Sequence, residues 1–484
     1  MSQQDGTNGI IINHQVLKQV VDELAPATLF RGISCRADAK WKPRMVVAAV
    51  LFLLTSGERT LSRAFTRSRK VVAKIFRWQS PPGDSYQGFV KQLRKWHEEL
   101  KWVIVIHLHT LMQERLSEQW TIGGFVVIAG DGSRIELSRT RSLEAAFSPR
   151  KKLASSAKNK RKRSQAKARS KKRAARKKSK AQSAESIRKK TNSPQMWLTL
   201  LWHVGSGLPW EWRTGPSDSS ERSHLEEMLP GLPEKALITA DAGFVGYEFW
   251  SRILKAGHHF LIRVGANVRL IRQLGYARQH AHTVYLWPNS AAKKLMPPLV
   301  LRLIALHDGR QPVYLVTDLP KSELSDRQAA EIYKARWGIE LFFRTFKQTF
   351  GCRKLRSHSA ENATWELDWS LIGLWCVCLW GELELARTGK DPTQLSAADA
   401  IAAFQDTLRD FRVRPDSPGE TLRNRLQVAL LDESERTSSK ASRNYPRKKK
   451  REHTSPPKIA KATKKQVQVA MQLKKATSEI RLTA

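Results

Sequence analysis

Cysteine is scarce in this sequence, and long apolar runs are missing. The chain has 484 residues but only four cysteines, at positions 35, 352, 376 and 378, and no two of them form a CxxC pair. That usage excludes a disulfide framework and a cysteine-based structural zinc site, and it is typical of a reducing compartment. The longest unbroken apolar run, residues 45–54, is far shorter than the ~20 residues that a membrane span needs. Residues 1–8 also lack the basic and apolar regions of a secretory signal, so we expect a cytoplasmic protein.

Acidic residues are too few to balance the basic ones. The 85 Lys and Arg residues exceed the 44 Asp and Glu residues by 41, which is the formal net charge. The composition is otherwise that of a globular protein, with 41% hydrophobic and 27% charged residues. A surface this basic repels itself unless it meets a polyanion. Nucleic acid is therefore the first partner to expect, and an acidic membrane surface is the second.

Two segments supply most of the excess positive charge. Residues 150–190 hold 20 Lys and Arg and one acid, and residues 440–465 hold 11 and one acid, which gives +19 and +10. Both segments nearly lack large apolar side chains, so each is predicted to be disordered on its own. A non-specific grip on DNA phosphates is the interpretation we favour. The alternative is a pair of solvated segments that happen to be basic.

The first 120 residues are predicted to be mostly helical. An apolar helix over 43–55 is followed by a break at 56–59, and then by a second helix over 60–76 whose non-apolar side is basic. A helix, a glycine-containing turn and a basic helix are typical of a helix-turn-helix that reads DNA. An ordinary helical hairpin has the same pattern, so both interpretations stay open.

Residues 121–350 change to an α/β pattern. The apolar, β-branched runs and the periodic segments between them predict strands and helices in alternation, closed by one long helix over 325–350. The predicted strands are 125–129, 196–204, 208–213, 236–239 and 259–264, with further short strands at 265–320; the predicted helices are 221–229 and 247–256. A second helical region follows, so the expected architecture is an α/β domain between two helical regions.

Two acids follow apolar strands, and a third lies in the long helix. Asp131 and Asp241 stand at predicted strand ends, where open α/β sheets bind ligands. Taken singly, each is better explained as an acid in a surface turn. Glu340 lies in helix 325–350 and shares one narrow stripe, beside an apolar arc, with Tyr333, Arg336 and Lys347.

The stripe has a functional and a structural interpretation. A solvated helix face in which Glu340 pairs with Arg336 explains an ion pair, but not a tyrosine and two cations aligned with one acid. Three carboxylates can hold two Mg²⁺ ions, which prefer oxygen ligands and together act on a phosphodiester. Arg336, Lys347 and Tyr333 would then bind DNA phosphates.

These motifs resemble those of a known family. The long helix fits the signature Y-x2-R-x3-E-x6-K as Tyr333, Arg336, Glu340 and Lys347. That signature, with Asp-Gly-Ser at 131–133 and Ala-Asp-Ala-Gly-Phe at 240–244, is similar to the DDE-type bacterial insertion-sequence transposases. The resemblance covers about residues 120–350. It implies that Asp131, Asp241 and Glu340 are the catalytic and metal-binding triad, and that Mg²⁺, for which Mn²⁺ is expected to substitute, is the cofactor.

The resemblance also implies a domain organisation and an activity. The activity is Mg²⁺-dependent cleavage at transposon ends followed by strand transfer into target DNA, performed by a homodimer on paired terminal inverted repeats. A nucleoid-associated cytoplasmic protein follows from that activity. The implied parts are a helical DNA-recognition domain (1–120), a ribonuclease H-like catalytic domain (121–350) with a β-rich insertion (265–320), and a helical region suited to dimerisation (351–437). The composition adds a basic insert (150–193) and a basic tail (438–484), both longer than the family needs.

Three points stay open at the level of the sequence. One alternative activity is a ribonuclease H-like, metal-dependent DNA nuclease that cuts without joining. Another is a non-catalytic, basic nucleic-acid-binding protein in which the acids are structural. Relatives stack a flipped base on an aromatic residue of the insertion, and Trp287 and Tyr285 are candidates for that position, but no motif aligns either of them.

Overall fold

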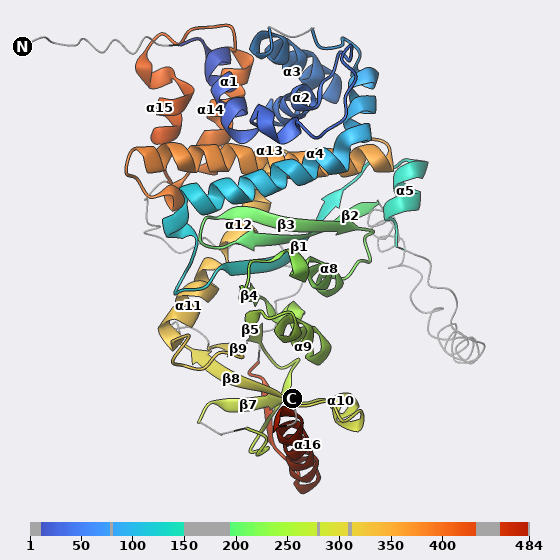
Figure 1. Cartoon of the computed structure of the whole chain (residues 1–484), viewed down its shortest axis with the longest axis vertical. Helices are drawn as coiled ribbons and strands as arrows, with labels where there is room; N and C mark the ends of the chain where they lie inside the picture. The colour runs from blue at the N-terminus through green and yellow to red at the C-terminus, as the bar shows by residue number, and fades with distance from the viewer. Residues whose placement is uncertain are drawn as a thin grey trace, which may run out of the picture.

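The computed structural model describes residues 11–77, 81–149, 194–277, 281–307, 312–431 and 455–482. The predicted basic insert at 150–193 and the first part of the predicted basic tail therefore lie outside the described residues. Figure 1 shows a helical body at one end, a sheet through the middle and a smaller group of strands and short helices at the other end. The two helical regions predicted at the ends of the chain form this one body together.

The helical body is built around two long helices that cross the molecule above the sheet (Figure 1). The central helix packs against N-terminal and C-terminal helices alike, so regions far apart in sequence share one core. The helices of this body are α1 (Asn13–Leu24), α2 (Pro43–Thr55), α3 (Leu61–Ile75), the long α4 (Tyr86–Arg115), the long central α13 (Ala360–Arg387), α14 (Ala397–Arg409) and α15 (Leu422–Gln427).

Helix α13 is the buried centre of this body. Of the described residues, it is the one helix long and apolar enough to cross a membrane by length and composition, and 94% of its apolar window is buried inside the protein. Its four tryptophans are all fully enclosed, which confirms them as packing residues: Trp365, Trp369, Trp375 and Trp380. A helix apolar all round is typical of the middle of a large core, and that is the position of α13.

All ten described strands belong to one sheet. Their order is β10-β6-β7-β8-β9-β5-β4-β1-β2-β3. β1 is antiparallel to β2, and β2 to β3, whereas β1, β4 and β5 are mutually parallel. The strands are β1 (Val127–Glu136), β2 (Gln195–His203), β3 (Leu208–Gly215), β4 (Leu237–Ala240), β5 (His259–Val264), β6 (Arg269–Arg272), β7 (Thr283–Leu286), β8 (Leu299–Leu306), β9 (Val313–Thr317) and β10 (Lys458–Lys461).

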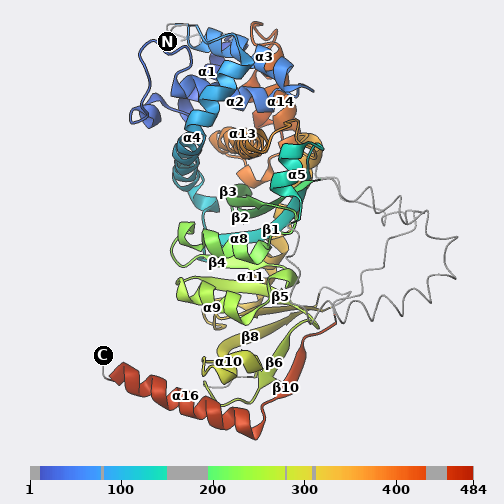
Figure 2. The same cartoon turned by 90° about the vertical axis from the view of Figure 1, so that its right-hand side faces the viewer.

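Shorter helices cover the sheet and lead to its edges. α8 contacts β1, β2 and β3, α9 contacts β5, and α12 contacts β1. Figure 2 shows α8 and α9 stacked beside the strands, with α16 beyond β10 at the far end. These helices are α5 (Arg141–Phe147), α8 (Glu221–Met228), α9 (Tyr247–Lys255), α10 (Asn289–Lys293), α11 (Asp326–Ala335), α12 (Gly338–Arg344) and α16 (Lys464–Leu482). The predicted mixture of strands and helices is confirmed, but the helical regions before and after it in the sequence pack together into one body.

The single long helix predicted over 325–350 is wrong. The segment divides into α11 and α12, and it ends in a π-helical turn at Thr345–Thr349. At the junction, the N–H groups of Trp337, Ile339 and Glu340 bond to carbonyls only three residues back, so the chain tightens there. A Cβ atom added at Gly338 would lie only 2.1 Å from the Cη2 atom of the Trp202 ring. Only glycine allows this close approach.

The tail is also more ordered than predicted. Residues 458–461 form β10, which pairs in parallel with β6, and α16 follows. Lys458 N donates to Val268 O at 3.0 Å, and Ala462 N donates to Arg272 O at 2.9 Å. A polar segment that cannot form a core can still complete an exposed sheet edge, because main-chain hydrogen bonds do not depend on apolar side chains. The prediction of disorder over 440–465 is therefore wrong for its last part.

Candidate active site

Two of the three predicted acids lie side by side because their strands are parallel neighbours. The register of β1 and β4 ends with Gly130 opposite Ala240, so Asp131 and Asp241 are the next residues on adjacent strands. Such strands lie about 4.8 Å apart, which brings the two side chains to one edge. The Asp241 carboxylate also caps the short helical turn after β4, where it accepts the Gly243 N–H at 2.7 Å. Asp131 accepts the Gly132 N–H at 2.8 Å.

The third acid reaches this edge through the broken helix. Glu340 lies in the first turn of α12, and α12 packs against β1. The Arg336 Nη2 atom is 3.2 Å from Glu340 Oε1, and the Arg336 guanidinium lies over the Tyr333 ring, 5.2 Å from its centroid. Arg336 is buried, so it fixes Tyr333 and Glu340 relative to each other across the helix break. The ion pair of the structural interpretation is thus present, and it lies within the same cluster as the acids.

Lys347 joins the cluster from the π-helical turn. Its Nζ donates to Ser133 Oγ at 2.5 Å, and Ser133 is two residues beyond Asp131 on β1. A π-helical turn changes the direction of the side chains within it and is frequent at functional sites. The structure therefore places all six predicted residues around the end of β4 and the middle of β1. The contact with Ser133 was not foreseen, because serine in an Asp-Gly-Ser turn is ordinary turn chemistry.

The electrostatics of the site show that these groups influence one another. Burial is the main reason why the pKa of Asp131 is raised to about 6. The negative charges of Asp241 and Glu340 raise this pKa further, whereas the hydrogen bond from Gly132 and the charge of Arg336 lower it. Burial likewise raises the pKa of Tyr333, although the charge of Arg336 works against the rise. Burial lowers the pKa of Lys347. Three carboxylates share the single guanidinium of Arg336 here, so negative charge is in excess. Such an arrangement favours the binding of an additional cation.

A fourth acid that the sequence did not single out belongs to this cluster. Glu221 is the first residue of α8, and the largest effect on it is burial, which raises its pKa to about 7, with further increases from Asp131 and Asp241. An acid in the first turn of a helix is usually explained by the helix dipole, so its sequence position gave no signal.

The three acids of the triad lie in one cluster, but their ligand oxygens are not all within 4.8 Å of one another. Across the described part of the chain, the one group of three His, Cys, Asp or Glu residues with ligand atoms all within 4.8 Å is His97, Glu98 and Asp368. The oxygens of Asp131, Asp241 and Glu340 are therefore more widely spaced than that, with Glu340 turned toward Arg336. Carboxylate oxygens in this number still fit a divalent cation with hard-ligand preference, because each acid can supply an oxygen and water the rest.

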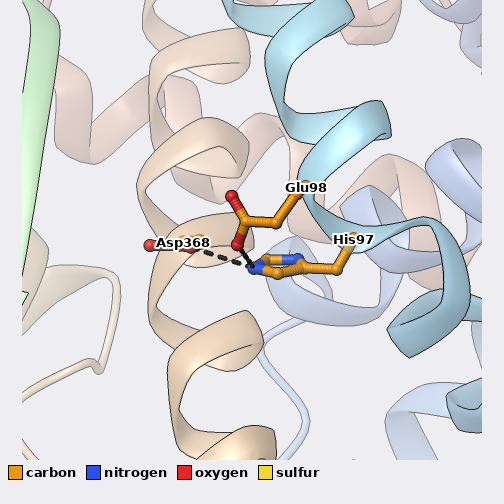
Figure 3. A group of neighbouring side chains, drawn as sticks. All are labelled: His97, Glu98 and Asp368. Carbon is orange, nitrogen blue, oxygen red and sulfur yellow. Dashed lines mark hydrogen bonds and ion pairs between the residues drawn. The ribbon is translucent and has the colours of Figure 1, made fainter.

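The tighter group, whose three side chains are drawn in Figure 3, is an ion-pair network around the buried Asp368 and not a second metal site. His97 Nε2 lies 3.0 Å from Asp368 Oδ2, and Lys101 Nζ lies 3.2 Å from the same oxygen and 2.7 Å from Glu98 Oε2. The other Asp368 oxygen accepts the Trp212 indole N–H at 2.7 Å. Lys101 already supplies the positive charge that a metal ion would bring, so the network is satisfied without one.

The two aromatic residues considered for base stacking are both enclosed. Tyr285 is fully buried, and Trp287 is buried with its indole N–H donating to Met296 O at 2.8 Å. Neither ring is presented to a base in this structure, so the position of a stacking aromatic stays unassigned.

A part of the chain that contains most of this site matches a family of known proteins. Residues 172–375 match the family model described as a transposase DDE domain. That range contains Asp241 and the whole Tyr-Arg-Glu-Lys signature, while Asp131 precedes it. This match agrees with the resemblance seen in the motifs, because the description of the family is that of a DDE transposase. Domains of this class use divalent metal ions, and transposases bind DNA.

Two individual proteins are similar to this chain. The chain is 24% identical over 267 residues to the transposase InsG for insertion sequence element IS4 of Escherichia coli (strain K12), covering 52% of this chain and 59% of the relative. It thus spans less than two thirds of that relative's length. Among solved structures, a piggyBac transposase synaptic complex with hairpin DNA is similar with a TM-score of 0.39 and 11% identity, covering 90% of this chain and 88% of that one.

Proposed function

We propose that the chain is a DNA transposase that cleaves transposon ends and transfers the resulting strands into target DNA. The observation that carries the proposal is the convergence of Asp131, Asp241 and Glu340 from two parallel strands and a helix, with the signature residues around them. A surface-turn role for the aspartates gives no reason for this convergence. The strand order β3-β2-β1-β4-β5, antiparallel and then parallel, supports the ribonuclease H-like core that the resemblance implies.

The carboxylates of this site would hold Mg²⁺, or Mn²⁺ in its place. The donor set is entirely oxygen, which suits these hard cations and not zinc. When two ions are bound they activate the attacking oxygen of water or a 3′-hydroxyl and stabilise the leaving oxygen. Asp131 and Asp241 would hold them from the sheet. Glu340 would complete the site once Arg336 exchanges part of its contact with Glu340 for a DNA phosphate.

The signature residues would orient the DNA strand. Arg336 and Lys347 bring positive charge to the two sides of the acid cluster, and Tyr333 stacks on Arg336. Charge-assisted bonds to phosphates on either side of the reacting one would fix the strand without reading its sequence. Burial lowers the pKa of Lys347, and an adjacent phosphate would oppose that shift by favouring the charged form.

We further propose terminal inverted repeats and target DNA as partners, with two copies of the chain acting on paired ends in the nucleoid. The net charge of +41 supports a polyanionic partner, and strand transfer of two ends requires two active sites to act together. The shared helical body would join the recognition helices of each copy to its sheet.

A strand-transfer assay tests the activity. Full-length protein, Mg²⁺ and a pre-cut terminal-repeat duplex with a free 3′-hydroxyl are incubated with plasmid, and joined products are resolved on a gel. We expect joined products that disappear with a chelator and with a 3′-deoxy end. Nicking without joining would instead support the nuclease alternative, and the absence of any metal-dependent product would support the non-catalytic one.

Helix α3 offers a specific DNA-contacting surface. Arg63, Lys70 and Lys74 are exposed, and their spacing of seven and four residues places them within about 40° on one face of the helix. The opposite face packs into the helical body through Val71, Val72 and their neighbours. We propose that this basic stripe contacts DNA phosphates, as the helix-turn-helix interpretation requires.

Neutralising the stripe should flatten the salt dependence of DNA binding. In R63Q/K70Q/K74Q, we expect the slope of log affinity against log salt to fall by about 3, since each lost phosphate contact removes about 0.9. Fluorescence anisotropy with a labelled duplex over a salt series measures the slope. The charge-matched control R409Q/R412Q/R414Q removes exposed cations elsewhere and should change it less. Equal slopes for the two triple variants would argue against the stripe.

A further inference from the structure

Glu221 enters the acid cluster from a side that no signature residue occupies. Helix α8 starts at Glu221 after Ser220, whose hydroxyl caps the helix by accepting the Ser223 N–H. The helix packs against β1, β2 and β3. This position directs the first side chain of α8 across β1, next to Asp131, while Glu340 approaches from α12.

The absence of a side chain at Gly132 makes room for the Glu221 carboxylate. A Cβ at position 132 would lie 2.5 Å from Glu221 Oε1 and 2.7 Å from Glu221 Cδ. Real Cβ atoms do not approach a neighbour so closely. The glycine after Asp131 therefore has a second role besides the turn, because it lets a carboxylate lie directly on the strand that carries the first acid of the triad.

Among the described residues, no cation forms a hydrogen bond with this carboxylate. The charges of Arg134 and Arg222 partly oppose the rise in its pKa, but Arg222 Nη1 donates to Val245 O at 2.8 Å, and Arg134 lies over the Trp197 ring. Asp131 and Asp241 are the nearest like charges that act on it. Packing a half-buried carboxylate against two others is unfavourable unless a cation joins them.

We infer that Glu221 is a fourth carboxylate of the divalent-cation pocket and that it holds one cation together with Asp131, directly or through a bound water. The inference rests on the proposed function, because it assigns a ligand to the metal site of that function. It explains why a glycine follows Asp131 and why α8 begins with an acid at this place. It also gives the pocket an oxygen donor that is not engaged by Arg336.

The test measures metal binding without DNA and without turnover. Full-length wild type, E221Q and E227Q are titrated with Mn²⁺, and free Mn²⁺ is followed by electron paramagnetic resonance. Glu227 is an exposed acid on the same helix, so E227Q removes an equal charge without touching the pocket. We expect E221Q to weaken Mn²⁺ binding by about 10-fold or more, as loss of a ligand or its supporting group does, and E227Q to leave it unchanged.

Two further variants separate the possible outcomes. G132A places a methyl group against the flexible end of the Glu221 side chain, so the carboxylate is displaced while the acid itself remains; we expect it to weaken Mn²⁺ binding as E221Q does. D131N serves as the reference for the pocket. Wild-type affinity in E221Q together with loss in D131N would overturn the role of Glu221 alone. Wild-type affinity in D131N would overturn the metal site of the proposed function as well.

Discussion

Replacing Asp131 with asparagine should reduce DNA cleavage by at least about a thousandfold, since a metal-held reaction loses several kcal/mol of transition-state stabilisation and each 1.36 kcal/mol is tenfold in rate. The carboxamide keeps the size of the side chain and cannot carry the negative charge that a divalent cation requires. Single-turnover cleavage of a terminal-repeat duplex in Mg²⁺ measures the change. D241N and E340Q should behave alike, because the three acids act as one unit.

DNA binding should survive these substitutions. The triad carries negative charge, so its loss does not remove a phosphate contact, and gel-shift affinity should stay the same or increase slightly. D326N is the matched control: Asp326 is a half-exposed acid at the start of α11, in the same part of the fold but outside the cluster. If D131N cleaved DNA at the rate of D326N, Asp131 would not be a metal ligand.

Much of the site could be predicted from the sequence because it depends on local rules. Apolar strands followed by acids predict side chains that meet at strand ends. Asp241 does follow β4, but the prediction is wrong for Asp131, which lies in the middle of β1 (Val127–Glu136). The two acids are neighbours because β4 ends beside β1 at the pair of Gly130 and Ala240. The stripe of Tyr333, Arg336 and Glu340 follows from helical periodicity, which holds across the break because the junction keeps helical dihedral angles.

What the sequence could not show depends on contacts between distant segments. The ring of Trp202 on β2 leaves no room for a side chain at Gly338, next to the helix break, and this contact cannot be seen in the sequence of the helix. Strand β10 exists because β6 offers a free edge, and the sequence Lys-Ile-Ala-Lys has no strong strand pattern of its own. Glu221 reaches the acids only because α8 starts beside Gly132, so its role is visible only in three dimensions.

Removing the buried acid Asp368 should destabilise the helical body by about 3–5 kcal/mol, the usual result of breaking a buried ion pair by deleting one partner. Asp368 is 3% exposed and receives contacts from His97 and Lys101 of α4 and from Trp212 of β3. D368A would leave the Trp212 N–H without its acceptor, and would leave His97 and Lys101 with only the exposed Glu98 as an acidic partner. Urea unfolding followed by tryptophan fluorescence measures the loss. D368A should also weaken the packing of α13 against α4 and the sheet.

The pH dependence of this network has a defined sign. Burial alone would raise the pKa of Asp368, but the hydrogen bond from His97 and the charge of Lys101 outweigh burial and lower it. A lowered folded-state pKa gives stability that is present above the unfolded value of about 3.9 and is lost as the pH falls through the lower folded value. The difference in unfolding free energy between wild type and D368A should therefore be full at neutral pH and shrink in strong acid.

Glu98 provides the matched control for this network. It contacts the same Lys101 and His97, but its side chain is 74% exposed, so solvent replaces its contacts when it is removed. E98A should cost less than about 1 kcal/mol, as exposed ion pairs do. If E98A and D368A were equally destabilising, or if added Zn²⁺ stabilised wild type but not D368A, the three side chains would be acting as a metal site and Lys101 would not be their partner.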